Sequence, residues 1–204
     1  MPEMLDAIRQ RRSVRKYQPR QVPSELVEEV LVAAGWAPSA HNSQPCRFIV
    51  LEDALVKRRL ADAMADAWAA DLAKDGAKVD AKMREERVER FAKAPVLILA
   101  CSTMDGLRKF PDAKRQMCER DLAMQSLGAA MQNLLLVAHV KGLGACWFCA
   151  PGFCKEIVRK VLKIPDSVEP EAFVIVGYPA ETPSVPKKKS FAEYCFMDEW
   201  GRKL

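Results

Sequence analysis

Residues 142–154 read GLGACWFCAPGFC and join different kinds of secondary structure. Gly142 and Gly144 end a long helical pattern, and the run GACWFCA then predicts a short buried strand at residues 144–150. The next run, PGFCKEIVRKVL, predicts another helix at residues 151–162. This stretch therefore indicates a chain in which short strands alternate with helices.

The rest of the chain follows the same pattern. Further strands are predicted at CRFIVLE (46–52), APVLILACS (94–102) and EAFVIVGYP (171–179). Further helices are predicted at residues 3–12, 23–38 with Ser24 as the N-cap, 53–74, 77–93 and 118–141, the last being apolar almost all round. Because helices come first and then separate the strands, we expect one α+β domain spanning 1–204, with a small mixed central sheet flanked by helices.

Composition excludes several classes of protein. The chain has 204 residues, of which 29% are charged, and a net charge of +5. These values are typical of a globular protein, and the basic runs lack the interleaved aromatic residues of a nucleic-acid binder. No apolar run is long enough to span a bilayer, and the charged start MPEMLDAIRQRRSVRKY lacks the apolar region of a signal peptide. We therefore expect a cytoplasmic protein that binds neither nucleic acid nor membrane.

The cysteine-rich run CWFCAPGFC (146–154) allows three interpretations. A metal site needs about four ligands, and neither a second CxxC nor a suitably spaced histidine is present. A redox dithiol needs an exposed thiol of low pKa, whereas Cys146 and Cys149 would point to opposite faces of a strand. Core packing is therefore favoured over metal or dithiol chemistry, and the backbone at the strand end remains free to face a ligand.

Two basic runs and one polar turn are candidate binding elements. RRSVRKY (11–17) carries arginine forks and a hydroxyl, which match phosphate oxygens, and Lys187–Lys189 form a second basic run. PSAHNSQP (38–45) offers amides that suit the edge of a heterocycle. Taken singly, the basic runs are also typical of solvated surface and the polar run of an ordinary turn.

Together these motifs resemble the FMN-dependent nitroreductase family. The resemblance rests on RRSVRKY, on APSAHNSQPCRFIVLED (37–53), on the strand beginning GLGACW and on the basic C-terminal segment. Four further stretches are similar to the nitroreductase-like C-terminal domain of the bacterial ligase that matures the deazaflavin coenzyme factor 420: DAWAADLAKDG, FPDAKRQMCERDLAM, GAAMQNLLLVAHVKGLGACW and FCKEIVRKVLKIP.

The resemblance implies a homodimer with two FMN sites at the subunit interface, part of it made by the helix at 118–141, and a C-terminal tail wrapped onto the partner. It implies that Arg11, Arg12, Ser13 and Arg15 bind the FMN phosphate and the pyrimidine edge of the ring, with Lys188 and Lys189 completing the phosphate site. It implies that Pro38, Ser39, Ala40, Asn42 and Gln44 line the ring from the other subunit. It also implies that the backbone of Trp147, Phe148 and Cys149 faces the ring, with the Cys149 N–H bonded to flavin N5 and the thiols of this run packed away.

The resemblance further implies a ping-pong oxidoreductase. Reduced nicotinamide would reduce FMN, which would pass hydride or electrons to a nitroaromatic, a quinone or a deazaflavin-like acceptor, with no catalytic side chain and no metal. A basic loop with Arg108, Lys109, Lys114 and Arg115, together with the basic helix 78–93, would hold the acidic tail of such an acceptor; the alternative, which the pattern alone favours, is that these charges are solvated surface. The alternatives are a non-catalytic flavin carrier and an oxygen-dependent flavin-cleaving enzyme.

Overall fold

The computed structural model describes residues 4–204. Its α-helices are α1 (Met4–Gln10), α2 (Ser24–Gly35), α3 (Ala54–Lys74), α4 (Ala81–Ala92), α5 (Ala113–Val140) and α6 (Lys155–Leu162). Its strands are β1 (Cys46–Leu51), β2 (Val96–Thr103), β3 (Gly144–Phe148) and β4 (Val168–Gly177), and short 3₁₀ turns cover Ala40–Asn42, Ala150–Phe153 and Phe191–Glu193. None of the helices in these residues combines the length and apolar composition that a bilayer crossing requires.

The four strands form one sheet in the order β1-β2-β4-β3, and every pair of neighbouring strands is antiparallel. The expected mixed sheet is therefore wrong for the strands of residues 4–204, where a parallel contact occurs only as an isolated bridge between Ser13 and Ala145. The connections explain this result. Helices α3 and α4 return the chain to the end of the sheet where β1 stops, so that Leu51 lies opposite Leu97 at the start of β2.

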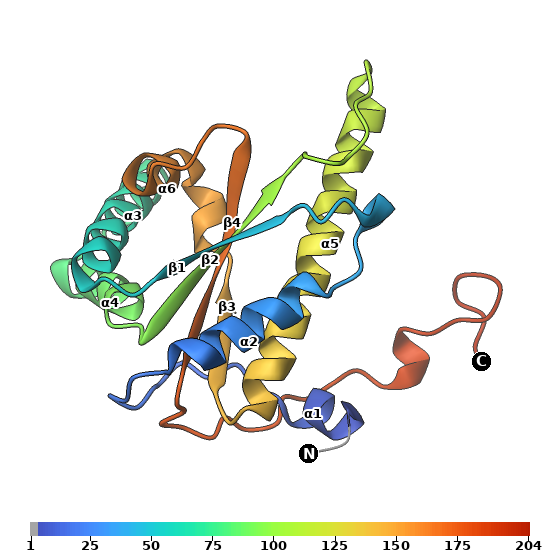
Figure 1. Ribbon diagram of the computed structural model, residues 1–204, viewed down its shortest axis with the longest axis horizontal. Coiled ribbons are helices and arrows are strands. Elements are labelled where there is room, and N and C mark those ends of the chain that lie inside the picture. Colours follow the sequence, from blue (N-terminus) through green and yellow to red (C-terminus); the bar gives the residue numbers. More distant parts are fainter. Residues whose placement is uncertain (1–3) are drawn as a thin grey trace.

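Two apolar layers pack on the two faces of the sheet (Figure 1). Helices α2 and α5 cover the face that carries Ile98 and Val174, and helices α3, α4 and α6 cover the face that carries Leu99 and Phe173. Side chains alternate between faces along a strand, and both faces are buried, so β2 is buried at all its positions. This explains why the strands are continuous apolar runs rather than alternating ones.

Helix boundaries differ from the sequence-based expectations in several places, including the start of α4 at Ala81 and the end of α2 at Gly35. Helix α5 begins at Ala113, five residues before the expected start at Cys118, because the Asp112 carboxylate accepts a hydrogen bond from the Arg115 N–H at 2.9 Å and caps the helix. Ser24 is the first residue of α2 and makes no capping hydrogen bond. The expected helix 151–162 is divided into a 3₁₀ turn and α6. The start of the first expected helix, residue 3, lies outside the described residues.

A partly buried ionic network fixes α6 to the sheet. The Lys155 ammonium lies 2.7 Å from the Glu171 carboxylate and 3.2 Å from that of Glu169, and Arg159 pairs with Glu169 at 2.6 Å. The Ser102 hydroxyl of β2 donates to Glu171 at 3.0 Å. Because Glu171 is only 9% exposed, these partners are needed to stabilise its buried negative charge.

Two segments project from the body of the molecule in Figure 1. One is the N-terminal end of α5, with the connection that precedes it. The other is the C-terminal tail after β4, which leaves the body beside α1 and ends far from the sheet. Neither segment adds a strand to the sheet, although both carry residues that the sequence selects as candidate binding groups.

Candidate cofactor-binding site

The basic segment at residues 11–17 lies along the edge strand β3. Ser13 forms a parallel bridge with Ala145, and the Val14 N–H donates to the Ala145 carbonyl at 3.1 Å. This close approach depends on Gly144, since a Cβ atom there would lie 2.8 Å from Val14 Cβ. The motif RRSVRKY and the strand beginning GLGACW are thus brought together at one sheet edge.

Glu181 and Tyr17 hold this segment in place. The Glu181 carboxylate accepts hydrogen bonds from the backbone N–H groups of Arg15 and Lys16 at 2.7 and 3.1 Å. The Tyr17 hydroxyl donates to the Val14 carbonyl at 2.5 Å, and burial raises the pKa of this phenol. Glu181 and Tyr17 thus fix the backbone of this segment. Arg12 Nη1 donates to the Arg9 and Arg11 carbonyls at 2.6 and 2.8 Å, which leaves the other N–H groups of its guanidinium available to a ligand.

A cavity of about 250 Å³ opens beside Arg11 and Arg12, and His139 and Glu181 also line it. The Arg11 Nε atom is buried there without a hydrogen-bond partner. Burial, followed by the charges of Arg11 and Arg12, lowers the pKa of His139. An unsatisfied guanidinium N–H with a second arginine beside it fits a phosphate group, which supplies both charge and acceptor oxygens.

The end of β3 presents its backbone beside this segment. Phe148 is the last β3 residue that pairs with β4. Its ring packs edge-on against that of Phe91, with 5.6 Å between the ring centres. Cys146 is 2% exposed, as expected for a packed thiol. The thiol of Cys149 is exposed, so the expectation that all thiols of this run are packed away is wrong for this residue. Cys149 lies beyond the strand at the start of a 3₁₀ turn, where its side chain leaves the core.

The polar loop at residues 38–44 has an unusual backbone. His41, Asn42 and Gln44 have φ angles of 55°, 52° and 47°, a left-handed conformation that costs free energy for residues other than glycine. Hydrogen bonds hold the loop in this form, with the Ala40 N–H donating to Ser126 Oγ at 3.3 Å. Strain of this kind is concentrated at ligand-binding segments, which supports a binding role for this loop.

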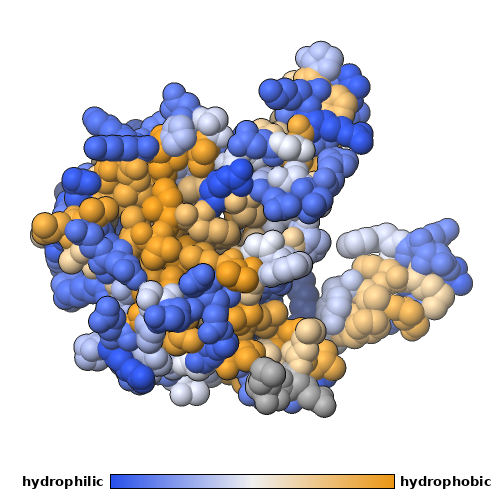
Figure 2. Space-filling view, viewed as in Figure 1, coloured by the Kyte–Doolittle hydropathy of each residue, from blue (hydrophilic) through white to orange (hydrophobic). Residues whose placement is uncertain are grey.

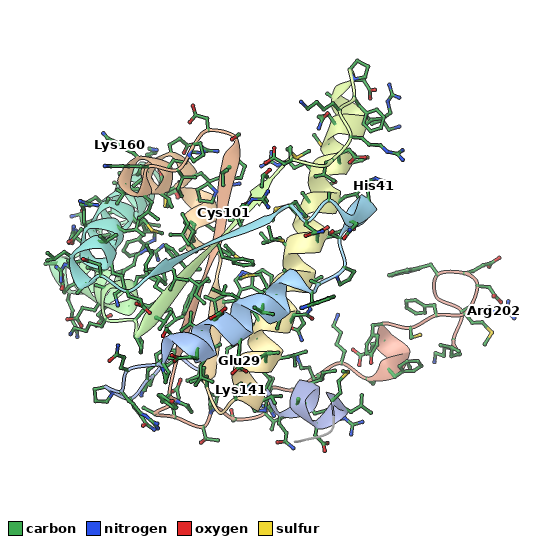
Figure 3. The ribbon with its side chains drawn as sticks, in the orientation of Figure 1. Glu29, His41, Cys101, Lys141, Lys160 and Arg202 are labelled. Atoms are coloured by element: carbon green, nitrogen blue, oxygen red, sulfur yellow. The ribbon has the colours of Figure 1, made fainter. Side chains whose placement is uncertain are left out.

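In a single chain this loop lies far from the basic segment. The loop contacts α5 at Ser126, whereas the cavity beside Arg11 contacts the same helix at His139. These residues are 13 positions apart in α5, or about 20 Å at the rise of an α-helix. Figure 3 shows the same separation, with His41 beside the upper half of α5 and Lys141 at its lower end.

The remaining candidates, Lys188 and Lys189, are exposed on the projecting tail. One chain therefore places the segment that carries Arg11, Arg12, Ser13 and Arg15 beside Ala145 of β3, the strand that leads to Trp147, Phe148 and Cys149. It does not bring Pro38, Ser39, Ala40, Asn42 and Gln44 to the same place.

The structure adds three residues that sequence reasoning did not select. His139 and Glu181 line the cavity beside Arg11, and the Arg90 guanidinium lies 5.9 Å from the centre of the Phe148 ring. No local motif marks these residues, because each comes from an element far away in the sequence. Within residues 4–204 no three His, Cys, Asp or Glu side chains lie close enough to bind a metal ion.

Comparison with known proteins agrees with this arrangement. Residues 8–178 match the sequence pattern of the nitroreductase family, and they include both the basic segment and the end of β3. The chain belongs to the nitroreductase family. A protein of Methanothermobacter thermautotrophicus, provisionally named NADH dehydrogenase/NAD(P)H nitroreductase, is 33% identical over 183 residues, which cover 89% of this chain and 80% of that protein.

Two crystal structures extend the comparison. A BluB-like flavoprotein from Clostridium difficile is 27% identical, with a TM-score of 0.81, and the match covers 98% of this chain and all (100%) of that one. A provisionally named nitroreductase from Desulfovibrio desulfuricans, solved in complex with FMN, is 28% identical with a TM-score of 0.72, covering 98% of this chain and 99% of that one. The nitroreductase fold expected from the sequence is confirmed.

Proposed function

We propose that this member of the nitroreductase family is a cytoplasmic, homodimeric, FMN-dependent oxidoreductase, formed by a single domain over 1–204. The observation that carries the proposal is the pairing of the basic segment with β3 through Ser13 and Ala145. It brings phosphate-binding side chains and an open strand end to one sheet edge. FMN has this combination of parts, a phosphate monoester at one end and a flat heterocycle at the other.

The phosphate group is assigned to the cavity beside Arg11 and Arg12. The unpartnered Arg11 Nε supports this assignment, as does the lining of the cavity by Gly144 and Ala145 of β3. Arg15, two residues beyond Ser13, is assigned to the pyrimidine edge of the ring. Lys188 and Lys189 are assigned to the phosphate, which requires the exposed tail to fold back or to reach a second chain.

The ring is assigned to the backbone of Trp147, Phe148 and Cys149 and to a partner chain. The contribution of the second chain is assigned to its strained loop, through Pro38, Ser39, Ala40, Asn42 and Gln44. The separation of about 20 Å along α5 supports this division, since one chain does not bring the loop to its own strand end.

Exposed apolar residues on the projecting tail support a homodimer. Phe191, Tyr194 and Trp200 are 58%, 63% and 92% exposed. Figure 2 shows apolar surface on this tail, away from the body of the same chain. Apolar area of this kind is stabilised by burial, and the tail of a homodimer would bury it on the partner.

When bound, FMN supplies the redox chemistry, accepting electrons from reduced nicotinamide and passing them to a small organic acceptor. The chain's own groups bind and orient the cofactor. Arg11 and Arg12 compensate the phosphate charge, Glu181 and Tyr17 fix the segment that carries them, and the end of β3 leaves one side of the site open to substrates.

The visible absorption spectrum of the purified protein tests the cofactor. We expect two flavin bands that move to the supernatant on heating and match FMN on chromatography. An Arg11→Gln variant should weaken FMN binding, whereas Arg9→Gln, an exposed arginine on α1, should not. A protein that stays colourless after incubation with FMN would refute the proposal.

Steady-state kinetics separates an enzyme from a flavin carrier. An enzyme oxidises reduced nicotinamide continuously when an acceptor such as a quinone is present, whereas a carrier does not turn over. Loss of flavin absorbance after reduction in air would indicate a flavin-cleaving enzyme instead. We expect continuous oxidation with the flavin spectrum retained.

We further propose that the acceptor is a deazaflavin-like anion, in line with the resemblance to the ligase domain. The loop residues Arg108 and Lys109 and the α5 residue Lys114 form no ion pair in residues 4–204, which supports an anion site there, whereas Arg115 pairs with Asp112. On helix α4, Arg84 pairs with Asp62 and Asp66 and is less available to a ligand. Titration of the FMN-loaded protein with a deazaflavin coenzyme should show saturable binding, and the Arg108→Gln variant should bind the coenzyme more weakly. The absence of saturable binding would refute this substrate.

A further inference from the structure

A second cavity lies on the other side of the basic segment. It has a volume of about 560 Å³ and is formed between residues 15–21 and the C-terminal end of α4. Four cations line it: Arg15, Arg20, Arg90 and Lys93. It shares no lining residue with the cavity beside Arg11, so the two basic cavities are distinct.

The charges of this cavity are largely uncompensated. Its carboxylate is that of Glu89, which pairs with Lys93. Within residues 4–204 the guanidinium groups of Arg15, Arg20 and Arg90 form no ion pair, and that of Arg15 donates to the Ser13 carbonyl at 3.3 Å. By contrast, the other end of α4 is neutralised by ion pairs to α3. Arg90 is thus an unpaired cation of α4 that lines this cavity.

Aromatic rings hold two of these cations in place. The Arg20 guanidinium lies 3.7 Å from the centre of the Tyr178 ring, and Arg90 lies 5.9 Å from that of Phe148. Stacking of this kind orders a guanidinium group without neutralising its charge. Phe148 is also the residue at the end of β3, so Arg90 connects this cavity with the strand end assigned to the flavin ring.

We propose that this cavity binds the phosphate groups of the reduced nicotinamide dinucleotide that donates electrons to the protein. The inference rests on the proposed function, in which the electron donor brings its nicotinamide ring to this strand end and its phosphates alongside. A dinucleotide carries a diphosphate, and the phosphorylated form carries a further phosphate monoester. With Arg15 assigned to the flavin ring, the guanidinium groups of Arg20 and Arg90 and the Lys93 ammonium supply donors for these anionic oxygens, and arginine forks bind phosphate in preference to a single carboxylate.

Substitutions remote from the flavin contacts test the proposal. Arg20→Gln and Lys93→Gln each remove one charge from the cavity, and Lys82→Gln removes an exposed charge from the other end of α4 as a matched control. We expect KM for the reduced dinucleotide to rise about two- to fivefold in each of the first two variants, as for a partly exposed charge pair. The double variant should combine both effects, and its residual affinity should depend less on salt.

Binding of a redox-inert tetrahydro analogue of the dinucleotide, measured by calorimetry, gives a readout that does not depend on turnover. We expect the dissociation constant to rise in Arg20→Gln and to stay unchanged in Lys82→Gln. The FMN dissociation constant should stay unchanged in both. This last measurement separates the present proposal from the assignment of FMN to the cavity beside Arg11.

Three results would overturn the proposal. Weaker FMN binding in Arg20→Gln would make this cavity part of the cofactor site, and an effect confined to the acceptor would assign it to the second substrate. Unchanged binding of the analogue would make these cations solvated surface. If the protein failed to bind FMN, the proposed function would fail, but saturable binding of the analogue that is lost in Arg20→Gln would still support the cavity.

Discussion

Gly144→Ala tests how the basic segment is positioned. The added Cβ atom would lie 2.8 Å from both Cβ and Cγ1 of Val14, whereas non-bonded carbon atoms pack at about 3.5–4.0 Å. Val14 is 7% exposed and its backbone N–H is bonded to Ala145, so the segment has to move away from β3 by about 1 Å. Overpacking of this kind costs about 1–3 kcal/mol of the free energy of unfolding.

Two measurements follow the consequences. Thermal unfolding without cofactor should show a melting temperature lower by about 2–12 °C, given about 2–4 °C per kcal/mol for a chain of this size. Fluorescence titration should show FMN binding weakened about 10- to 150-fold, as for the loss of one hydrogen bond to a charged group, because Arg11 and Ser13 move with Val14. Gly128→Ala is the control, since its Cβ would meet nothing within 4 Å and alanine favours the helix.

The double variant Val14→Gly with Gly144→Ala separates a local clash from general damage. Removing the Val14 Cβ together with its methyl groups makes room for the new Cβ, so the double variant should be more stable than the sum of the two single effects predicts, by about 0.5–3 kcal/mol. Unchanged FMN affinity in Gly144→Ala would refute the reasoning, because the segment would then not depend on its contact with β3. Additive effects in the double variant would refute the proposed clash.

Three further predictions follow from buried and exposed charges and thiols. Burial and the neighbouring arginines lower the pKa of His139, and a bound phosphate would raise it. FMN should therefore bind with proton uptake, and more tightly as the pH falls from 8 toward 6.5. Calorimetry should show no proton uptake when riboflavin binds or when FMN binds to His139→Gln. Cys149 and Cys118 are exposed, whereas burial raises the pKa of Cys101 to about 12, so mass spectrometry should find iodoacetamide on Cys149 and Cys118 before Cys101. Cys149→Ser should retain FMN. Lys155→Met leaves the Glu171 carboxylate buried without its cation, and urea unfolding should show a loss of about 3–5 kcal/mol.

Local signals in the sequence placed most elements correctly. Apolar runs gave strands at β1, β2, β3 and β4, and the Gly142 stop gave the end of α5. The start of α5 was missed by five residues although Asp112 is a good N-cap, because the basic loop that contains it hides the onset of helical periodicity. Errors of this size arise where a cap and the periodic pattern do not begin together.

Strand direction was not available from these signals. The antiparallel order β1-β2-β4-β3 depends on how α3 and α4 return the chain, and a pattern of apolar runs is the same for either direction. The buried network of Lys155 and Glu171 depends in the same way on packing α6 over β4. Both are consequences of which surfaces meet, which local sequence does not record.

The sequence by itself determined most elements, the family and the candidate groups for binding FMN, because periodicity, capping and motif spacing act over a few residues. Only the tertiary structure decided that Ser13 lies against Ala145, that His139 and Arg11 line one cavity, and that the strained loop at 38–44 contacts α5 about 20 Å along the helix from His139. The pairs that meet lie more than 120 positions apart in the chain. Their approach is decided by burial of the apolar faces of the sheet and α5, a property of the whole fold rather than of any segment.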